Sequence, residues 1–149
     1  MCVPSTSHTI DGVRICIDTN LLIAALTKRD GASARIVEAW LAGDVEVVTS
    51  EATQREAELV LGRGWLARMT SRAIVDDLLE NLRTRSIVVD PDEIDDIGLK
   101  DEGDRRMVEA AVSGGAKYVV TTDREFLSKR GYGETEFVTP REMLESLRL

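Results

Sequence analysis

The sequence is poor in the residues that build zinc sites, disulfide frameworks and nucleophilic triads. Its 149 residues include one histidine and two cysteines. Cys2 and Cys16 have no metal-type spacing, and His8 lies in a polar leader, so we expect neither a zinc site nor a nucleophile with a histidine base. Cys16 falls in a strand pattern, where a thiol usually behaves as a small buried hydrophobe.

Long apolar runs are also missing. The longest unbroken run, residues 21–26, is far shorter than the roughly 20 residues that a membrane span needs. The first 12 residues lack the basic-then-apolar order of a signal peptide, so we expect a cytoplasmic protein. The net charge of -8 speaks against a nucleic-acid binder that works by bulk attraction, although local basic patches stay open.

The composition, 43% hydrophobic and 31% charged, predicts one folded domain over residues 14–149 behind a leader of residues 1–13. Short runs rich in β-branched residues alternate with helical patterns, which favours a three-layer α/β/α sandwich around a mainly parallel, five-stranded sheet. The predicted strands are residues 14–17, 45–49, 86–89, 117–122 and 136–138.

Helical stripes and end signals lie between these strands. Gly114 and Gly115 can close one helix, and Thr139 with Glu142 forms a capping-box pattern at the start of the last one. The apolar stripes comprise Ile36, Val37, Trp40 and Leu41, then Ile74, Val75, Leu78, Leu79 and Leu82, then Met107, Val108, Ala111 and Val112.

Two aspartates directly follow predicted strands. Asp18 ends the first strand, and Asp123 ends the "KYVVTT" strand. Ligands of open parallel sheets bind outside the carboxyl ends of the strands, so both side chains should reach the same rim. Taken singly, each aspartate is also explained as a turn former or a helix N-cap.

Glu56 is predicted to point inward. On a helix starting near Ser50 it shares a face with apolar residues, whereas Glu51 and Glu58 lie well round the helix. The stripe that contains Glu56 comprises Ala52, Leu59 and Val60.

Asp104 is likewise predicted to share a face with apolar residues on a later helix, and Asp101, three residues earlier, is predicted to point in the same direction. For both, a salt-bridged or helix-capping acid is the structural alternative. The stripe that contains Asp104 comprises Met107, Val108 and Ala111, and the residues predicted to turn outward are Glu102, Arg106 and Glu109.

Carboxylates from separate elements that meet at one end of a sheet repel one another unless a cation lies among them. Oxygen ligands alone favour Mg²⁺ or Mn²⁺. Such an ion neutralises a phosphate and lowers the pKa of a bound water, which suits phosphodiester hydrolysis. No phosphate-cradling glycine loop is present, because Gly62-Arg63-Gly64 lacks both the spacing and the preceding strand.

Four segments arrive in the order of a known family: "IDTNLLIAAL", "VVTSEATQRE", "KDEGDRRMVEAAVSGGAKYVVTTDREFL" and "FVTPREML". With them, the chain from Arg14 to about Leu147 resembles a PIN-domain ribonuclease, particularly the toxin of a bacterial toxin–antitoxin pair. The resemblance implies a PIN-like fold and an endoribonuclease dependent on Mg²⁺ or Mn²⁺. It also implies homodimers or higher homo-oligomers and an inhibitory antitoxin.

The resemblance carries over to particular residues. Asn20 would orient a metal-binding carboxylate, and Thr121 would hydrogen-bond in the same pocket. Relatives usually have a proline and an aspartate where Glu102 and Gly103 stand, which leaves a metal role for Asp101 open. The implied catalytic and metal-binding cluster is Asp18, Glu56, Asp104 and Asp123.

An RNA substrate beside so many acids requires basic side chains at the rim, although each is also explained as a solvated surface charge. Trp40 is assigned to the core. Trp65 could stack on a base, but burial between helices is the preferred interpretation. The RNA-binding candidates are Arg63, Arg68, Arg72, Arg105, Arg106, Lys129 and Arg130.

Two other readings stay open. One is a non-catalytic PIN-like module that binds RNA or protein. The other is a Mg²⁺-dependent phosphoacceptor domain, with Asp18 or Asp90 as the acceptor. A haloacid-dehalogenase-like phosphatase would have an aspartate in place of Asn20, and a receiver would have a lysine in place of Thr139, so this reading is weaker.

Overall fold

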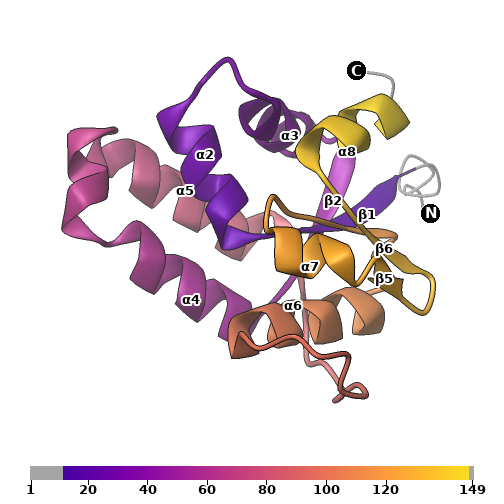
Figure 1. The fold of residues 1–149 in the computed structure, drawn as a ribbon. Helices are drawn as coiled ribbons and strands as arrows, with labels where there is room; N and C mark the ends of the chain where they lie inside the picture. The colour runs from indigo at the N-terminus through magenta and orange to yellow at the C-terminus, as the bar shows by residue number, and fades with distance from the viewer. Residues whose placement is uncertain (1–11, 148–149) are drawn as a thin grey trace, which may run out of the picture.

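A computed structural model of the chain describes residues 12–147 and shows a sheet with helices packed on both faces (Figure 1). The three-layer arrangement confirms the predicted fold class. Most of the predicted leader lies outside the described residues, and so do Cys2 and His8.

The sheet has six strands within the described residues, in the order β3-β2-β1-β4-β6-β5. The five predicted strands are present and parallel, and β5 is an added antiparallel strand that forms a hairpin with β6. With two residues, β5 is too short to carry an alternating pattern, so periodicity could not find it. The strands are β1 Val13–Ile17, β2 Val45–Ser50, β3 Ser86–Val89, β4 Tyr118–Val120, β5 Gly131–Tyr132 and β6 Thr135–Val138.

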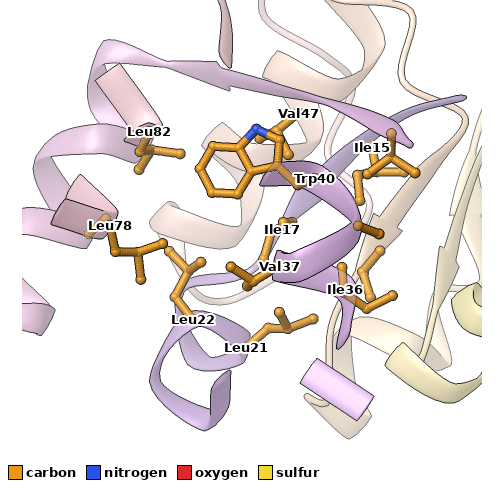
Figure 2. Close-up of a cluster of buried hydrophobic side chains, with 14 of the residues drawn as sticks. Ile15, Ile17, Leu21, Leu22, Ile36, Val37, Trp40, Val47, Leu78 and Leu82 are labelled. Atoms are coloured by element: carbon orange, nitrogen blue, oxygen red, sulfur yellow. The ribbon is translucent and has the colours of Figure 1, made fainter. Parts of the chain in front are cut away.

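One face of the sheet carries the larger core cluster, which Figure 2 shows in close-up. Ile15, Ile17 and Val47 point from the strands toward the helices. Trp40 is buried as predicted, and its indole N–H donates to the Arg85 carbonyl at 3.1 Å. The helices that contribute are α2 Thr19–Thr27, α3 Ala32–Leu41, α4 Glu51–Leu61, α5 Arg72–Thr84 and α8 Pro140–Leu147.

The opposite face is covered by α6 Glu102–Ser113 and α7 Arg124–Ser128. Cys16 lies in this second cluster and is buried, as its strand position predicts. Phe126 and Phe137 pack edge to face with ring centroids 4.8 Å apart. The helices of residues 12–147 are all too short or too polar to cross a bilayer.

The predicted helix ends are confirmed. Helix α6 ends at Ser113, and Gly115 follows with a φ of +68°, a left-handed conformation that glycine adopts readily. At the start of α8, the Glu142 N–H donates to Thr139 Oγ1 at 3.1 Å, and the Thr139 N–H donates to Glu142 Oε1 at 2.9 Å. This reciprocal pair is the predicted capping box.

The burial predicted for Trp65 is wrong, since its side chain is 45% exposed. It lies on the 3₁₀ helix η1 Gly64–Arg68, which joins α4 to α5 at the end of a hairpin that projects from the sheet (Figure 1). A residue at such a tip has few neighbours to cover it. Exposure there depends on tertiary position, which local periodicity does not report.

Two helix-face assignments are also wrong. Leu59 is 76% exposed, and the stripe of α4 that is buried contains Ala57 and Leu61. Glu109, predicted to face outward, is 3% exposed. Residues 90–101 lie against α6, where Arg105 donates to the Ile94 carbonyl at 3.3 Å, and a non-periodic segment of this kind gives no warning of the face that it covers.

Candidate active site

The candidate site lies at the carboxyl ends of β1 and β4. These strands are parallel neighbours, with Ile17 opposite Val120. From β1 the chain builds β2 and β3 on one side and then returns to build β4 on the other. In open α/β sheets, ligands bind outside the carboxyl ends of the strands at such a change of direction. Asp18 and Asp123 both follow strands at this point.

Asp18 is held in place by several hydrogen bonds. Its side chain is 4% exposed and caps α2 by accepting the Asn20 N–H at 3.4 Å. The hydroxyl of the fully buried Thr121 donates to Asp18 Oδ2 at 2.6 Å. Burial raises the pKa of Asp18, whereas the bond from Thr121 lowers it.

Thr121 also connects Asp18 to Asp123. Its Oγ1 accepts the Asp123 N–H at 3.1 Å while the same hydroxyl donates to Asp18. Asp123 caps α7 by accepting the Glu125 N–H at 2.9 Å. Because the charge on Asp123 raises the pKa of Asp18, the two carboxylates act on each other across this threonine.

Helix α6 supplies two further aspartates. Asp101 is the N-cap and accepts the N–H groups of Gly103 at 2.7 Å and of Asp104 at 3.3 Å. Asp104 turns inward and is 9% exposed. The pKa of Asp104 is raised to about 7, first by burial and then by the negative charges of Asp18, Asp101, Asp123 and Glu56, in that order. The four other carboxylates therefore lie within electrostatic reach of Asp104.

Glu56 reaches the same cluster from α4. Its side chain is half-buried, and burial raises its pKa, as do the charges on Asp101 and Asp18. The Thr19 hydroxyl opposes this rise in the pKa of Glu56. Glu56 therefore faces the cluster even though the apolar stripe from which its direction was predicted is exposed.

The other predicted residues occupy varied positions. The contact from Asn20 to Asp18 comes from its backbone N–H, and the Asn20 side chain is exposed. Arg105 and Arg106 lie on α6, where they face the buried Glu109 at 3.6 Å and 3.8 Å, and Arg106 also pairs with Glu102 at 3.0 Å. Their charges are thus engaged within the helix.

The other predicted RNA-binding residues lie in two groups. Arg63, Arg68 and Arg72 surround the exposed Trp65 on the α4–η1–α5 hairpin, and Arg72 pairs with Asp76 at 2.9 Å. Lys129 and Arg130 follow α7 and precede β5. Neither group forms a hydrogen bond or an ion pair with the five acids in the part of the chain that the structure describes.

Two residues beside the acids were missed by sequence reasoning. Thr19 is 4% exposed and lies next to Asp18, and Gly103 contacts Glu56 on the first turn of α6. The sequence could have indicated Gly103, because a glycine inside a helix makes the helix less stable than an alanine does, and so calls for a local reason. No such indication existed for Thr19, apart from its position next to Asp18.

The donor set fits a hard divalent cation. The five acids offer oxygen ligands, and none of the ion pairs in residues 12–147 involves any of them. Within the same residues, no three acidic, histidine or cysteine side chains are arranged to hold an ion as they stand. Binding would therefore require side-chain rotation. The half-buried Glu56 is the least restrained of the acids, because Asp18, Asp101 and Asp123 are held as helix N-caps.

Two solved structures are similar to this chain in fold. The crystal structure of PAE2754 from Pyrobaculum aerophilum has a TM-score of 0.61 at 18% identity, covering 97% of this chain and 99% of that chain. The crystal structure of VapBC2 from Rickettsia felis, bound to a DNA fragment from its promoter, has a TM-score of 0.54 at 13% identity. The match covers 85% of this chain and 98% of that chain. These likenesses show the fold.

The search of curated proteins gave no match. The sequence itself matches the PIN domain over residues 14–125, a segment that runs from β1 into α7 and contains all five acids of the cluster. The chain therefore belongs to the PIN domain family.

Proposed function

We propose that this protein is a metal-dependent endoribonuclease that hydrolyses RNA phosphodiester bonds. PIN domains are in general nucleases that use divalent metals. The observation that carries the proposal is the cluster of Asp104 with four other acids. Burial and these four charges raise the pKa of Asp104 to about 7, and none of the five acids forms an ion pair within residues 12–147. A protein tolerates such repulsion where a cation offsets it.

The residues have distinct roles in this proposal. Asp18, Glu56, Asp104 and Asp123 hold Mg²⁺ or Mn²⁺, and Asp101 is a further candidate ligand. The bound ion supplies charge neutralisation at the phosphate and a water of lowered pKa. Thr121 fixes the orientation of Asp18 through the 2.6 Å hydrogen bond. With a pKa of about 7, Asp104 exchanges its proton near neutral pH, so protons and metal ions compete for it.

Chelator-sensitive cleavage tests the proposal. Purified protein is incubated with several structured RNAs and Mn²⁺, with and without EDTA, beside Asp18→Asn as the inactive control. We expect cleavage that EDTA and Asp18→Asn both abolish. Incubation with single-stranded DNA of the same sequence shows whether cleavage requires the ribose 2′-hydroxyl. Absence of chelator-sensitive cleavage on every RNA would favour a non-catalytic module that binds RNA or protein.

The hairpin between α4 and α5 supports an RNA-binding role outside the cluster of five acids. Arg63 and Arg68 form none of the ion pairs found in residues 12–147, and Trp65 between them is 45% exposed. Arginine binds phosphate, and an exposed indole can stack on an unpaired base. Lys129 and Arg130 are secondary candidates because they follow the helix that Asp123 caps.

An apolar groove gives a toxin role a specific place for an antitoxin. It is bordered by α2, α3 and α5, and the Rickettsia felis neighbour is a VapBC2 protein. An apolar helical segment of an antitoxin would fit such a groove. The apolar part of its lining consists of Ala25, Leu26, Ala34, Val37, Leu41, Ile74 and Leu78.

A growth assay tests the toxin role. Induced expression of the protein in bacteria should arrest growth, and Asp18→Asn should relieve the arrest.

The family resemblance extends the proposal to a cytoplasmic homodimer or higher homo-oligomer. Sedimentation of the purified protein at several concentrations measures its assembly. A single species with the mass of one chain at every concentration would exclude self-association.

A further inference from the structure

The Glu56 carboxylate lies against Gly103, a glycine inside a helix, and the buried hydroxyl of Thr19 in the same cluster has no hydrogen-bond partner in the described structure. We propose that Thr19 and Gly103 are positioning residues that hold Glu56 in the acidic cluster. The proposal rests on the proposed function, because it concerns how the fourth acid of the metal site is brought into place.

Gly103 provides the space for this carboxylate. A Cβ atom added to Gly103 would overlap Glu56 Oε1 and would lie 2.8 Å from its Cδ and 2.9 Å from Asp101 Oδ1. The backbone at Gly103 is helical and has no positive φ that would require glycine. Since glycine in a helix is less favourable than alanine, the contact with Glu56 is the local reason for a glycine here.

Thr19 is the first residue of α2 and lies next to Asp18 in the same cluster. Its side chain is 4% exposed, and its hydroxyl has no hydrogen-bond partner at ordinary distance in the described structure. A buried hydroxyl without a partner costs free energy. Glu56 is the acid whose pKa this hydroxyl lowers, which agrees with Glu56 as the partner that Thr19 lacks.

Glu56 needs such support more than the other acids do. Asp18, Asp101 and Asp123 are each fixed as helix N-caps by backbone N–H groups. Glu56 has a longer side chain, starts from a helix that projects from the sheet, and accepts no hydrogen bond at ordinary distance within residues 12–147. Its place in the cluster therefore depends on the neighbours that leave it room and offer it a donor.

Gly103→Ala tests the first neighbour. The added methyl meets the end of a flexible side chain, so the fold should persist while Glu56 turns outward. We expect the Glu56 carboxyl-carbon NMR resonance of the metal-free protein to move and the Mn²⁺-induced rise in Tm to shrink. RNA cleavage should fall by about 10- to 100-fold in kcat with little change in KM. Gly31→Ala is the matched control, because its Cβ would make only ordinary contacts, at 3.4 Å from Lys28, and it lies outside both the acidic cluster and the α4–η1–α5 hairpin.

Thr19→Val tests the second neighbour. It keeps the shape and removes the donor, so it should lower the Mn²⁺-induced rise in Tm, and Thr19→Ser should restore it. Thr27→Val is the control on the same helix, since the Thr27 hydroxyl bonds only backbone carbonyls of α2. Equal losses in Thr19→Val and Thr19→Ser would show that packing rather than the hydroxyl matters.

A double-mutant cycle shows whether both residues act through Glu56. In a Glu56→Ala background, Gly103→Ala should cause no further loss of the Mn²⁺-induced shift. A further loss of the same size would place the effect on Asp101 or Asp104 and overturn the proposal. So would an unmoved Glu56 resonance in Gly103→Ala. If the unmodified protein neither binds Mn²⁺ nor cuts RNA, the proposed function fails, and the NMR comparison still decides where Glu56 is held.

Discussion

Asp104 is the residue whose proton affinity the site changes most. Its pKa rises from an ordinary value of 3.8 to about 7, first through burial and then through four neighbouring acids. The folded state therefore holds a proton more tightly there than the unfolded chain does. In the absence of metal, the folded protein loses stability as that proton leaves.

The pH dependence of stability follows from this sign. Without metal, the free energy of unfolding should fall as pH rises from about 4 to about 7 and should level off above that range. The raised pKa values of Asp18 and Glu56 act in the same direction. Urea denaturation in EDTA at pH 5 and pH 8 measures the effect. A protein more stable at pH 8 than at pH 5 would show that other groups outweigh the cluster.

Replacing Asp104 by Asn should stabilise the metal-free protein, because it removes the charge that burial and repulsion oppose. We expect a gain of about 2–4 kcal/mol at pH 8 from the raised pKa and a smaller gain at pH 5. Activity and the Mn²⁺-induced rise in Tm should be lost. Thermal and urea unfolding measure both effects, and lower stability at pH 8 would instead assign Asp104 a structural role.

Individual site residues could be predicted where one short-range rule sufficed. Asp18 and Asp123 follow strands, and Asp104 shares a helical face with apolar residues, so position alone indicated them. The direction of Glu56 was predicted from a stripe that contains the exposed Leu59, so the reasoning was wrong although Glu56 does face the cluster. The role of Gly103 depends on a contact between α4 and α6 that no local pattern contains.

At the scale of elements, caps and turns fix where the helices begin and end. Asp18, Asp101 and Asp123 each cap a helix and each contribute to the cluster. The first turns of α2, α6 and α7 therefore meet at the site. Their N–H groups orient the carboxylates, and the positive ends of these helices offset part of the negative charge.

The capping box of α8 forms no hydrogen bond with the five acids in the described part of the chain, so its loss tests the effect of a cap on stability alone. Thr139→Ala removes the acceptor for the Glu142 N–H and should lower the free energy of unfolding by about 1 kcal/mol. RNA cleavage and the Mn²⁺-induced rise in Tm should stay unchanged. Urea denaturation is the measurement, and an unchanged midpoint would mean that water replaces the cap without cost.

Elements with strong local signals were predictable, and the others were not. The five parallel strands and the ends of α6 and α8 follow from periodicity and capping residues. Strand β5 forms only because the turn at Gly133 returns the chain onto β6. Likewise, the exposure of Trp65 reflects how far the α4–η1–α5 hairpin projects, which depends on packing between distant segments.

At the scale of the whole molecule, the net charge of -8 repels a polyanion. An acidic ribonuclease must then hold RNA through a few local cations, helped by bound metal. The hairpin cations Arg63 and Arg68 are the best placed of these, because they lie outside the cluster of five acids and form none of the ion pairs in residues 12–147.

Removing both hairpin arginines tests this view. Arg63→Ala with Arg68→Ala should weaken RNA binding across sequences and reduce the slope of log affinity against log salt by about 1.4, as expected for two lost phosphate contacts on a single strand. Fluorescence anisotropy at several salt concentrations measures both. The control replaces Arg55 and Arg83, which pair with Glu51 and Glu80, and an equal loss there would point to overall charge.

The central claim is that acids from four separate parts of the chain form one cation site. Anomalous diffraction from crystals soaked in Mn²⁺ tests it most directly. We expect a manganese peak within about 2.0–2.3 Å of carboxylate oxygens of Asp18, Asp104 and Asp123, with Glu56 turned toward it. Crystals of active protein that show manganese only elsewhere, or none at these carboxylates, would contradict the account.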